Sequence, residues 1–190
     1  MSLENEMSQI FEHLDLIQFS PLSIESLGLS ETSSSFLKKV QFPSQYQNLL
    51  LKFSPTLHPL FSSDSNLKNL YVLGLEFIDR LELLSQGLES KSDRQQFIFS
   101  YLCIDRRTEK ILCIEAGNFF ETFVNTDIIC FARSLIAYHK IDDRVEDRLD
   151  DDEYLQQITA ELKEQLLEID PAIASSEENW WMSVLAGVWT

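Results

Sequence analysis

Apolar side chains recur along the chain at spacings that change from helical to extended and back to helical. Between Met7 and Ile17 they stand three or four positions apart, which predicts an amphipathic helix that ends at the Ser20-Pro21 step. Ser30 is a suitable cap for a second helix, predicted to run to about Val40. The N-terminal part of the chain is therefore expected to be helical.

The middle of the chain has the residue pattern of β-strands. Residues 43–66 contain three prolines between short apolar pieces and predict mostly loop with short strands. Predicted strands then cover Tyr71–Leu75, Phe97–Ile104, Ile111–Ile114 and Phe119–Val124. A short charged connection, residues 105–109, joins the second and third of them and is typical of an antiparallel hairpin. Both faces of that hairpin are apolar, so its strands are expected to lie centrally in the sheet.

Helical spacing returns after residue 125. Asn125, Thr126 and Asp127 are cap residues for a helix with one apolar stripe, formed by Ile128, Phe131, Leu135 and Tyr138. A later helix that ends at Pro171 has an apolar face of Leu155, Ile158, Leu162, Leu166 and Ile169. Trp180-Trp181 opens a short closing helix, expected either to place one indole in the core and one half-exposed at its edge, or to contact a partner. Together these elements predict an α+β fold: a central, mostly antiparallel sheet flanked by N-terminal and C-terminal helices.

The composition agrees with one globular domain over residues 1–190. Apolar residues make up 44% of the chain, and a domain of this length buries a substantial core. No apolar run is long enough to cross a membrane, and the acidic first fifteen residues do not resemble a secretory signal, so a cytoplasmic location is expected. The three cysteines, an odd number in hydrophobic surroundings, are expected to be buried reduced thiols.

The net charge of -16 changes this picture, because it disfavours direct binding to nucleic acid and to anionic membranes. The charge is uneven along the chain. Residues 142–190 carry 14 acidic and three basic side chains, a net charge of -11. The last quarter of the chain therefore holds most of the negative field.

The densest part is residues 142–153, with two arginines among eight carboxylates: Asp142, Asp143, Glu146, Asp147, Asp150, Asp151, Asp152 and Glu153. This run is predicted to enter the helix that follows, where the helix dipole favours negative charge. A calcium loop is disfavoured, because the central glycine and the spaced terminal glutamate of an EF-hand are missing. Two interpretations stay open: a solvated helix entry with internal Arg–carboxylate pairs, or a partner-binding surface.

No motif in the sequence indicates catalysis. The histidines are scattered, and no zinc-ligand pair, phosphate loop or nucleophile elbow occurs. Cys130 and His139 share a predicted helix, but nine positions at 100° each place them on opposite faces. The histidines are expected at the surface and the cysteines in the core. We expect neither enzymatic activity nor a cofactor or metal.

The order of these signals resembles the SUKH superfamily, in particular its group-four immunity-protein branch, over residues 18–188. The resembling parts are the segment Pro21–Pro43 with its helix, the strand Tyr71–Glu76 with Gly74, the hairpin Phe97–Glu115, the switch Phe123–Thr126, the motif Ile169-Asp170-Pro171 and Trp180-Trp181. Two positions depart from the family pattern: Gln41 stands where glycine often ends the helix, and the 105–109 connection lacks its usual glycine.

The resemblance implies a non-enzymatic immunity protein that neutralises a bacterial toxin, often a nuclease. Together with the charge it predicts that the eight carboxylates of residues 142–153 bind a protein partner with a basic toxin domain, through steered association. The alternative is a cytoplasmic scaffold or regulatory adaptor of the same superfamily, in which the acidic segment only keeps the chain soluble.

Overall fold

The computed structural model describes residues 1–60, 67–78, 97–145, 148–175 and 179–187. Its elements, in chain order, are α1 (Leu3–Ile10), β1 (Leu16–Ile17), α2 (Pro21–Leu27), α3 (Glu31–Lys39), β2 (Phe42–Pro43), β3 (Gln45–Tyr46), the 3-10 helix η1 (Gln47–Leu49), β4 (Leu51–Pro59), β5 (Leu70–Ile78), β6 (Phe97–Asp105), β7 (Ile111–Glu115), β8 (Glu121–Asn125), α5 (Ile128–Val145), α6 (Asp152–Ile169), the 3-10 helix η2 (Pro171–Ser175) and α7 (Trp180–Gly187).

The central sheet has six strands in the order β3-β4-β5-β6-β7-β8, and every neighbouring pair is antiparallel. The predicted hairpin is confirmed, because β6 pairs with β7 from Ser100–Glu115 to Ile104–Ile111. Both strands have neighbours on each side, as their two apolar faces predicted. A second sheet joins β1 to β2. The expected α+β fold with an antiparallel sheet is confirmed.

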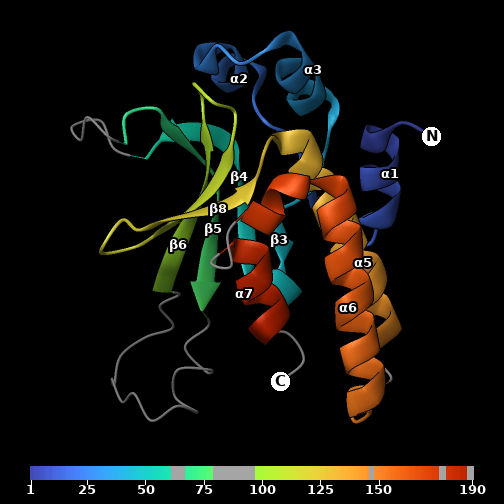
Figure 1. The fold of residues 1–190 in the computed structure, drawn as a ribbon. Helices are drawn as coiled ribbons and strands as arrows, with labels where there is room; N and C mark the ends of the chain where they lie inside the picture. Colours follow the sequence, from blue (N-terminus) through green and yellow to red (C-terminus); the bar gives the residue numbers. More distant parts are fainter. Residues whose placement is uncertain (61–66, 79–96, 146–147, 176–178, 188–190) are drawn as a thin grey trace, which may run out of the picture.

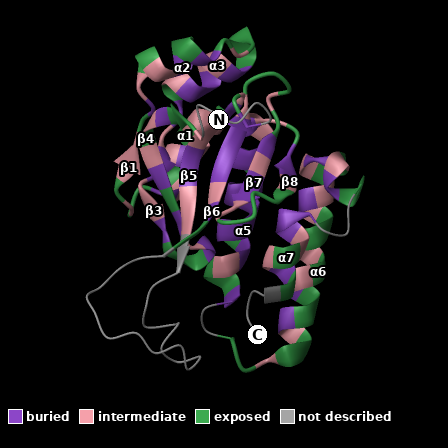
Figure 2. Cartoon of the chain, turned by 90° about the vertical axis from the view of Figure 1, so that its left-hand side faces the viewer, coloured by how far each residue is buried: buried purple, intermediate pink, exposed green. Residues whose placement is uncertain are grey.

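Helices cover one face of the sheet. In Figure 1, α5, α6 and α7 stand on one side of the strands, α1 lies outside α5, and α2 and α3 lie across one end. Figure 2 shows the opposite face, where strands β5, β6 and β7 have no described helix in front of them. None of the described helices has the length and apolar character needed to span a membrane.

The main hydrophobic core lies between the sheet and the helices. It draws buried side chains from both ends of the chain, from Met7 in α1 to Leu185 in α7. A smaller cluster on the other face of the sheet has four buried members, Leu67, Leu70, Cys103 and Ile114. Burying both faces of β6 and β7 explains why their sequences read as continuous apolar runs.

The predicted N-terminal helix is wrong at its C-terminal end. Helix α1 begins earlier, because the Ser2 hydroxyl accepts the Asn5 N–H, and it stops at Ile10. Residues Leu16–Ile17 leave the helix and pair with β2 instead. The Ser20-Pro21 step, predicted to end a helix, starts the unpredicted α2, because proline at the first helical position loses no hydrogen bond. Helix α3 begins at the Ser30 cap, as predicted.

Strand β4 corrects the prediction of mostly loop for residues 43–66. Its apolar residues Leu51, Phe53 and Leu57 are buried against the helices. Pro55 is accommodated because the register with β5 shifts between Phe53 and His58, where a ladder hydrogen bond is not required. The Pro55 carbonyl instead accepts the Ser20 N–H at 2.8 Å. The prolines therefore mark an irregularity within a strand and not the absence of one.

Glu109 closes the β6–β7 turn in an uncommon way. Its φ of 62° is left-handed, which explains how the turn forms without a glycine. Its carboxylate accepts hydrogen bonds from the Ser30 N–H, the Ser30 hydroxyl and the Ser33 hydroxyl, and so binds the N-terminus of α3. Partial burial opposes ionisation, but the hydrogen bonds from Ser33 and Ser30 outweigh it and lower the pKa of Glu109 below 4.5.

This contact gives stability a defined dependence on pH. A lowered folded-state pKa contributes stability above the unfolded value, which is lost as pH falls through the folded pKa. We therefore expect Glu109→Gln to be less stable than the wild type at pH 7, with the difference shrinking once the pH falls below 4.5. Urea unfolding of both proteins, from pH 7 to below pH 4.5, measures this difference in the free energy of unfolding. A difference that stays constant with pH would contradict the prediction.

Candidate functional site

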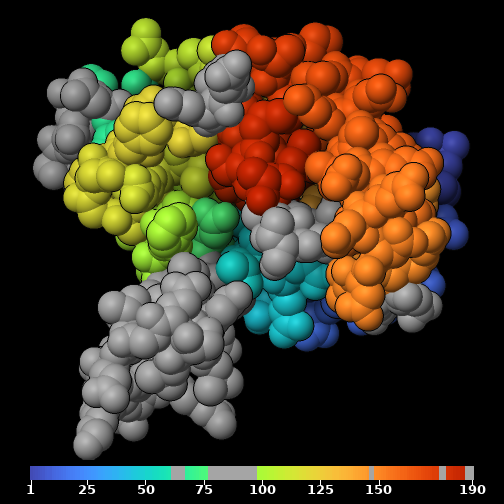
Figure 3. Space-filling model, turned by 60° about the horizontal axis from the view of Figure 1, so that its bottom comes forward, coloured from blue at the N-terminus to red at the C-terminus, as the bar shows by residue number. Residues whose placement is uncertain are grey.

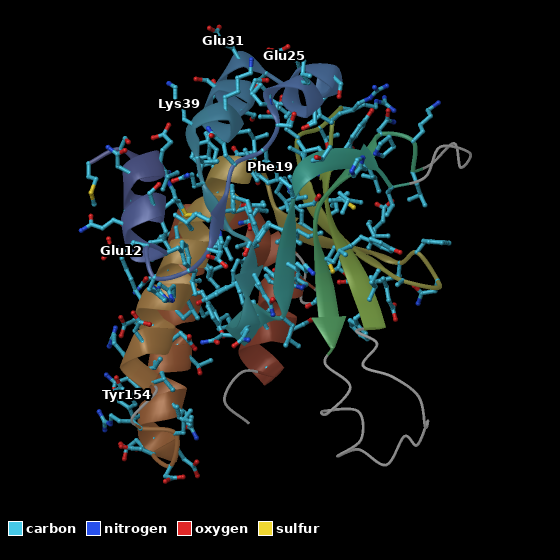
Figure 4. All side chains as sticks on the ribbon, turned by 180° about the vertical axis from the view of Figure 1, so that it is seen from behind. Glu12, Phe19, Glu25, Glu31, Lys39 and Tyr154 are labelled. Carbon is cyan, nitrogen blue, oxygen red and sulfur yellow. The ribbon has the colours of Figure 1, made fainter. Side chains whose placement is uncertain are left out.

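The acidic segment lies at the end of a helical hairpin formed by α5 and α6. We call the described members Asp142, Asp143 and Asp150–Glu153 the acidic tip. Glu146 and Asp147, predicted with them, lie outside the described residues. Figure 1 shows this end of the hairpin projecting away from α2 and α3, and Figure 4 shows Tyr154 at the far end from Glu31. The fold therefore presents the tip away from the N-terminal helices.

The prediction that the whole segment enters one helix is wrong. Asp142 and Asp143 belong to the last turn of α5, where the helix dipole disfavours negative charge. Asp151 caps α6 and accepts the Tyr154 N–H at 3.0 Å, and Asp152 and Glu153 occupy its first turn. This hydrogen bond and the one from Arg148 lower the pKa of the Asp151 carboxyl. Helix-dipole stabilisation thus applies to the second half of the segment only.

Part of the acidic tip is bound within the molecule. The Asp142 carboxylate accepts a hydrogen bond from the Asn48 side chain. Asp143 lies 3.7 Å from the His139 ring nitrogen Nδ1, although its own side chain is 66% exposed. These contacts indicate a structural role for both aspartates in the last turn of α5.

The two arginines of the segment are also engaged inside the molecule. Arg144 makes a bidentate contact with Glu161 in α6, at 2.6 and 2.9 Å. Arg148 pairs with Asp151 at 2.6 Å and lies 3.6 Å from the centre of the Tyr154 ring. The predicted Arg–carboxylate pairs therefore exist. They neutralise Asp151 and Glu161.

Three carboxylates project from the tip without a described partner. Asp150, Asp152 and Glu153 are exposed, and within the described ranges none of them has an ion pair or side-chain hydrogen bond. Leu149, beside them, is 55% exposed. In Figure 3 the start of α6 forms part of the surface beside α7. This group combines negative charge with one exposed apolar side chain.

A buried polar cluster that the sequence did not indicate lies one helical turn before the acidic tip, around His139 of α5. His139, expected at the surface, is only 6% exposed, and its Nδ1 lies 3.1 Å from the Tyr46 hydroxyl. Its ring stacks on Phe11 at 4.9 Å. Burial and the neighbouring Asp142 raise the pKa of Tyr46 far above its usual range, so the phenol stays protonated. The acidic tip is thus fixed to the core through α5.

The cysteines show no sign of nucleophilic activation. Cys103 and Cys113 are buried, and Cys130 is partly buried. Burial, with Glu76 adding to it, raises the pKa of Cys113 to about 12, and burial and Asp127 raise that of Cys130 to about 12. The Cys130 thiol contacts the Ile169 carbonyl, whereas His139 contacts Tyr46. Among the described residues no group of side chains could hold a metal ion.

The tryptophan pair belongs to the core. Trp180 is 5% exposed and Trp181 is fully buried, so the prediction of a half-exposed indole or a partner contact is wrong. The Trp181 Nε1 donates to the Asn125 side-chain oxygen at 2.9 Å. The Trp180 Nε1 donates to Glu76 in β5 at 3.3 Å. Both indoles therefore hold α7 against the sheet.

Asn125 also belongs to a buried network around Asp170. The Asp170 carboxylate accepts from the Thr126 N–H at 2.6 Å and hydroxyl at 2.8 Å, from the Asn125 amide at 3.1 Å, and from the Ala172 N–H at 3.2 Å. Asp170 is 2% exposed and Asn125 is fully buried. This network joins β8, the end of α6 and α7, and it gives the fully buried Asn125 amide an acceptor.

Comparison with known proteins identifies a family. No curated protein and no solved structure matches the chain. The family model described as SUKH-4 immunity protein matches residues 3–187, nearly the full length of the 190-residue chain. The match spans both the antiparallel sheet and the helical hairpin that carries the acidic tip. The chain therefore belongs to the SUKH-4 immunity protein family.

Proposed function

We propose that the chain neutralises a cognate toxin by binding the toxin's basic surface with its acidic tip. Membership of an immunity-protein family supports a toxin-neutralising role. A nuclease is the kind of toxin that fits the charge, because an enzyme that acts on nucleic acid presents a cationic face to its substrate. An acidic inhibitor occupies that face and excludes the substrate. Catalysis by this chain has no part in the proposal.

One observation carries the choice of surface. Asp150, Asp152 and Glu153 project together from one end of a helical hairpin, while Arg144 and Arg148 already have carboxylate partners. The local field is therefore negative and is directed at solvent. Steered association between such a patch and a cationic partner accelerates encounter at low ionic strength. Asp142 and Asp143 contribute to the field from the last turn of α5, and Glu146 and Asp147 are proposed to do so with them.

The acidic tip can be tested by neutralising its three projecting carboxylates. We expect the triple variant Asp150→Asn, Asp152→Asn, Glu153→Gln to associate with the toxin about tenfold more slowly at low salt, and to show a weaker salt dependence. Stopped-flow binding to a purified cognate toxin domain, to be sought first among the products of adjacent genes, measures both effects. Thermal unfolding should shift only slightly, because Asp150 has no partner in the described fold and the other two lose only a helix-dipole interaction of about 0.3–1 kcal/mol each.

A matched variant separates position from total charge. Glu12, Glu164 and Glu168 are exposed and also have no ion pair among the described residues. Figure 4 places Glu12 beyond α1, away from Tyr154 and the tip. Neutralising these three glutamates removes the same charge and should leave most of the association rate intact. Equal slowing by both variants would assign the effect to net charge and overturn the proposed surface.

Protection tests the function itself. Co-expression with the neighbouring toxin should restore growth, and the purified protein should inhibit the toxin stoichiometrically. A chain that binds and protects against no such toxin would support the scaffold or adaptor role instead. If a variant without the charges of the acidic tip still protects, the immunity function stands and the acidic tip is not the surface that provides it.

A further inference from the structure

Exposed apolar side chains gather at one end of the sheet, remote in sequence from the acidic tip. Seven large hydrophobic residues are exposed in the described parts of the chain, and four of them lie here: Ile98, Phe99, Phe119 and Phe120. Phe99 is 51% exposed and Phe120 is 55% exposed. Single exposed apolar residues are ordinary, but such a concentration at one place is typical of an interaction surface.

Backbone hydrogen bonds bring these residues together around the β7–β8 turn. The Phe99 carbonyl accepts the Ala116 N–H at 2.9 Å. The adjacent Glu115 bonds to both phenylalanines of the turn: its carbonyl accepts the Phe119 N–H, and its N–H donates to the Phe120 carbonyl. We call Phe99, Phe119 and Phe120 the aromatic turn.

The aromatic turn is held in one conformation. Phe119 has a left-handed φ of 59°, which is unfavourable for a bulky side chain. The Asn118 side chain donates to Glu115 at 2.7 Å and accepts the Phe120 N–H at 2.9 Å, and so braces the turn on both sides. A surface that is already ordered loses little conformational freedom when it binds. The fold therefore holds two exposed phenyl groups in a strained but fixed position.

The charges around the aromatic turn indicate what kind of surface would bind it. Glu115 and Glu121 flank the phenyl groups, and Glu121 has no ion pair in the part of the chain that the structure describes. A second copy of the chain is a poor occupant, because two molecules of charge -16 repel each other. An apolar pocket bordered by lysine or arginine is complementary to this surface.

We propose that the aromatic turn inserts into such a pocket on the toxin, as a second contact beside the acidic tip; this rests on the proposed function. Figure 3 shows the segment around the β7–β8 turn and the start of α6 on the same side of the molecule, with α7 between them. One partner seated over α7 reaches both. The acidic tip then accelerates encounter, and the aromatic turn slows dissociation, because buried aromatic side chains dominate the strength of interfaces.

A variant that spares the turn tests this assignment. Phe119→Asn suits the left-handed position, and Phe120→Thr suits the residue that leads into β8, so the double variant removes two of the three phenyl groups of the aromatic turn while it keeps the backbone. We expect dissociation from the purified, catalytically inactivated toxin domain to accelerate about tenfold or more, with the salt dependence of association unchanged. Leu22→Ala, which removes a 79% exposed apolar side chain from α2, is the control and should bind as the wild type does.

The outcomes separate this inference from the function on which it rests. Wild-type protein that does not bind the toxin overturns both. Wild-type binding with an unchanged dissociation rate in the double variant overturns the aromatic turn alone. Sedimentation of the free protein provides a further check: wild-type dimers that the double variant abolishes would make the turn a contact between copies and reject the toxin as its occupant. Circular dichroism and thermal unfolding must show a folded variant, and Phe120→Thr alone serves if the double variant unfolds.

Discussion

Asp170→Ala is expected to lower the free energy of unfolding by about 3–5 kcal/mol, because it removes four hydrogen bonds from a buried carboxylate. The Thr126 N–H, the Asn125 amide and the Ala172 N–H would lose their acceptor. A hydrogen bond to a charged group contributes about 1.5–3 kcal/mol, and less at the exposed Thr126 than at the fully buried Asn125. Urea denaturation followed by circular dichroism measures the loss, and poor recovery of soluble protein at 37 °C would accompany it.

Two further variants show whether the carboxylate network is responsible. Asp170→Asn retains one acceptor oxygen and should lose clearly less stability than alanine. Asp150→Ala removes an aspartate that is exposed at the acidic tip, and it should leave the unfolding free energy nearly unchanged. If Asp170→Ala costs no more than Asp150→Ala, the network does not stabilise the fold as described.

Trp181→Ala is expected to have an effect of the same size, about 3–5 kcal/mol, because it leaves a cavity where a fully buried indole packs. Trp181→Phe keeps most of the apolar contact but leaves the Asn125 oxygen without its donor. It should therefore cost about 1–3 kcal/mol. The same denaturation measurement separates the packing contribution from the hydrogen bond. Equal losses for the two substitutions would mean that packing of the indole contributes little.

Much of the fold followed from the sequence, because long apolar elements follow simple periodicities. The hairpin of β6 and β7 and the apolar face of α6 were predicted close to their observed positions. The errors occur where tertiary contacts override local pattern. Leu16–Ile17 leave the predicted helix because they pair with β2, and Pro55 is tolerated inside a strand because the register with β5 shifts beside it. Local rules cannot supply this information.

The candidate site was located by its charge, but its internal contacts were not predictable. Asp142 is bound by Asn48, which is 94 residues away in the sequence, and the burial of His139 depends on Tyr46 and Phe11. Phe119 was predicted to begin a strand, since its apolar neighbours suggest one, but it occupies the left-handed position of a turn. The carboxylates that project into solvent can be identified only when these pairings are known.

The network of Asn125, Asp170 and Trp181 also bears on how the chain folds as it is synthesised. Its three members lie on β8, at the end of α6 and on α7, so it cannot close until residue 181 has left the ribosome. Until then the Asn125 end of the sheet has a buried polar site without its partners. A nascent chain therefore leaves this part of the helix-facing side of the sheet uncovered until α7 has been synthesised.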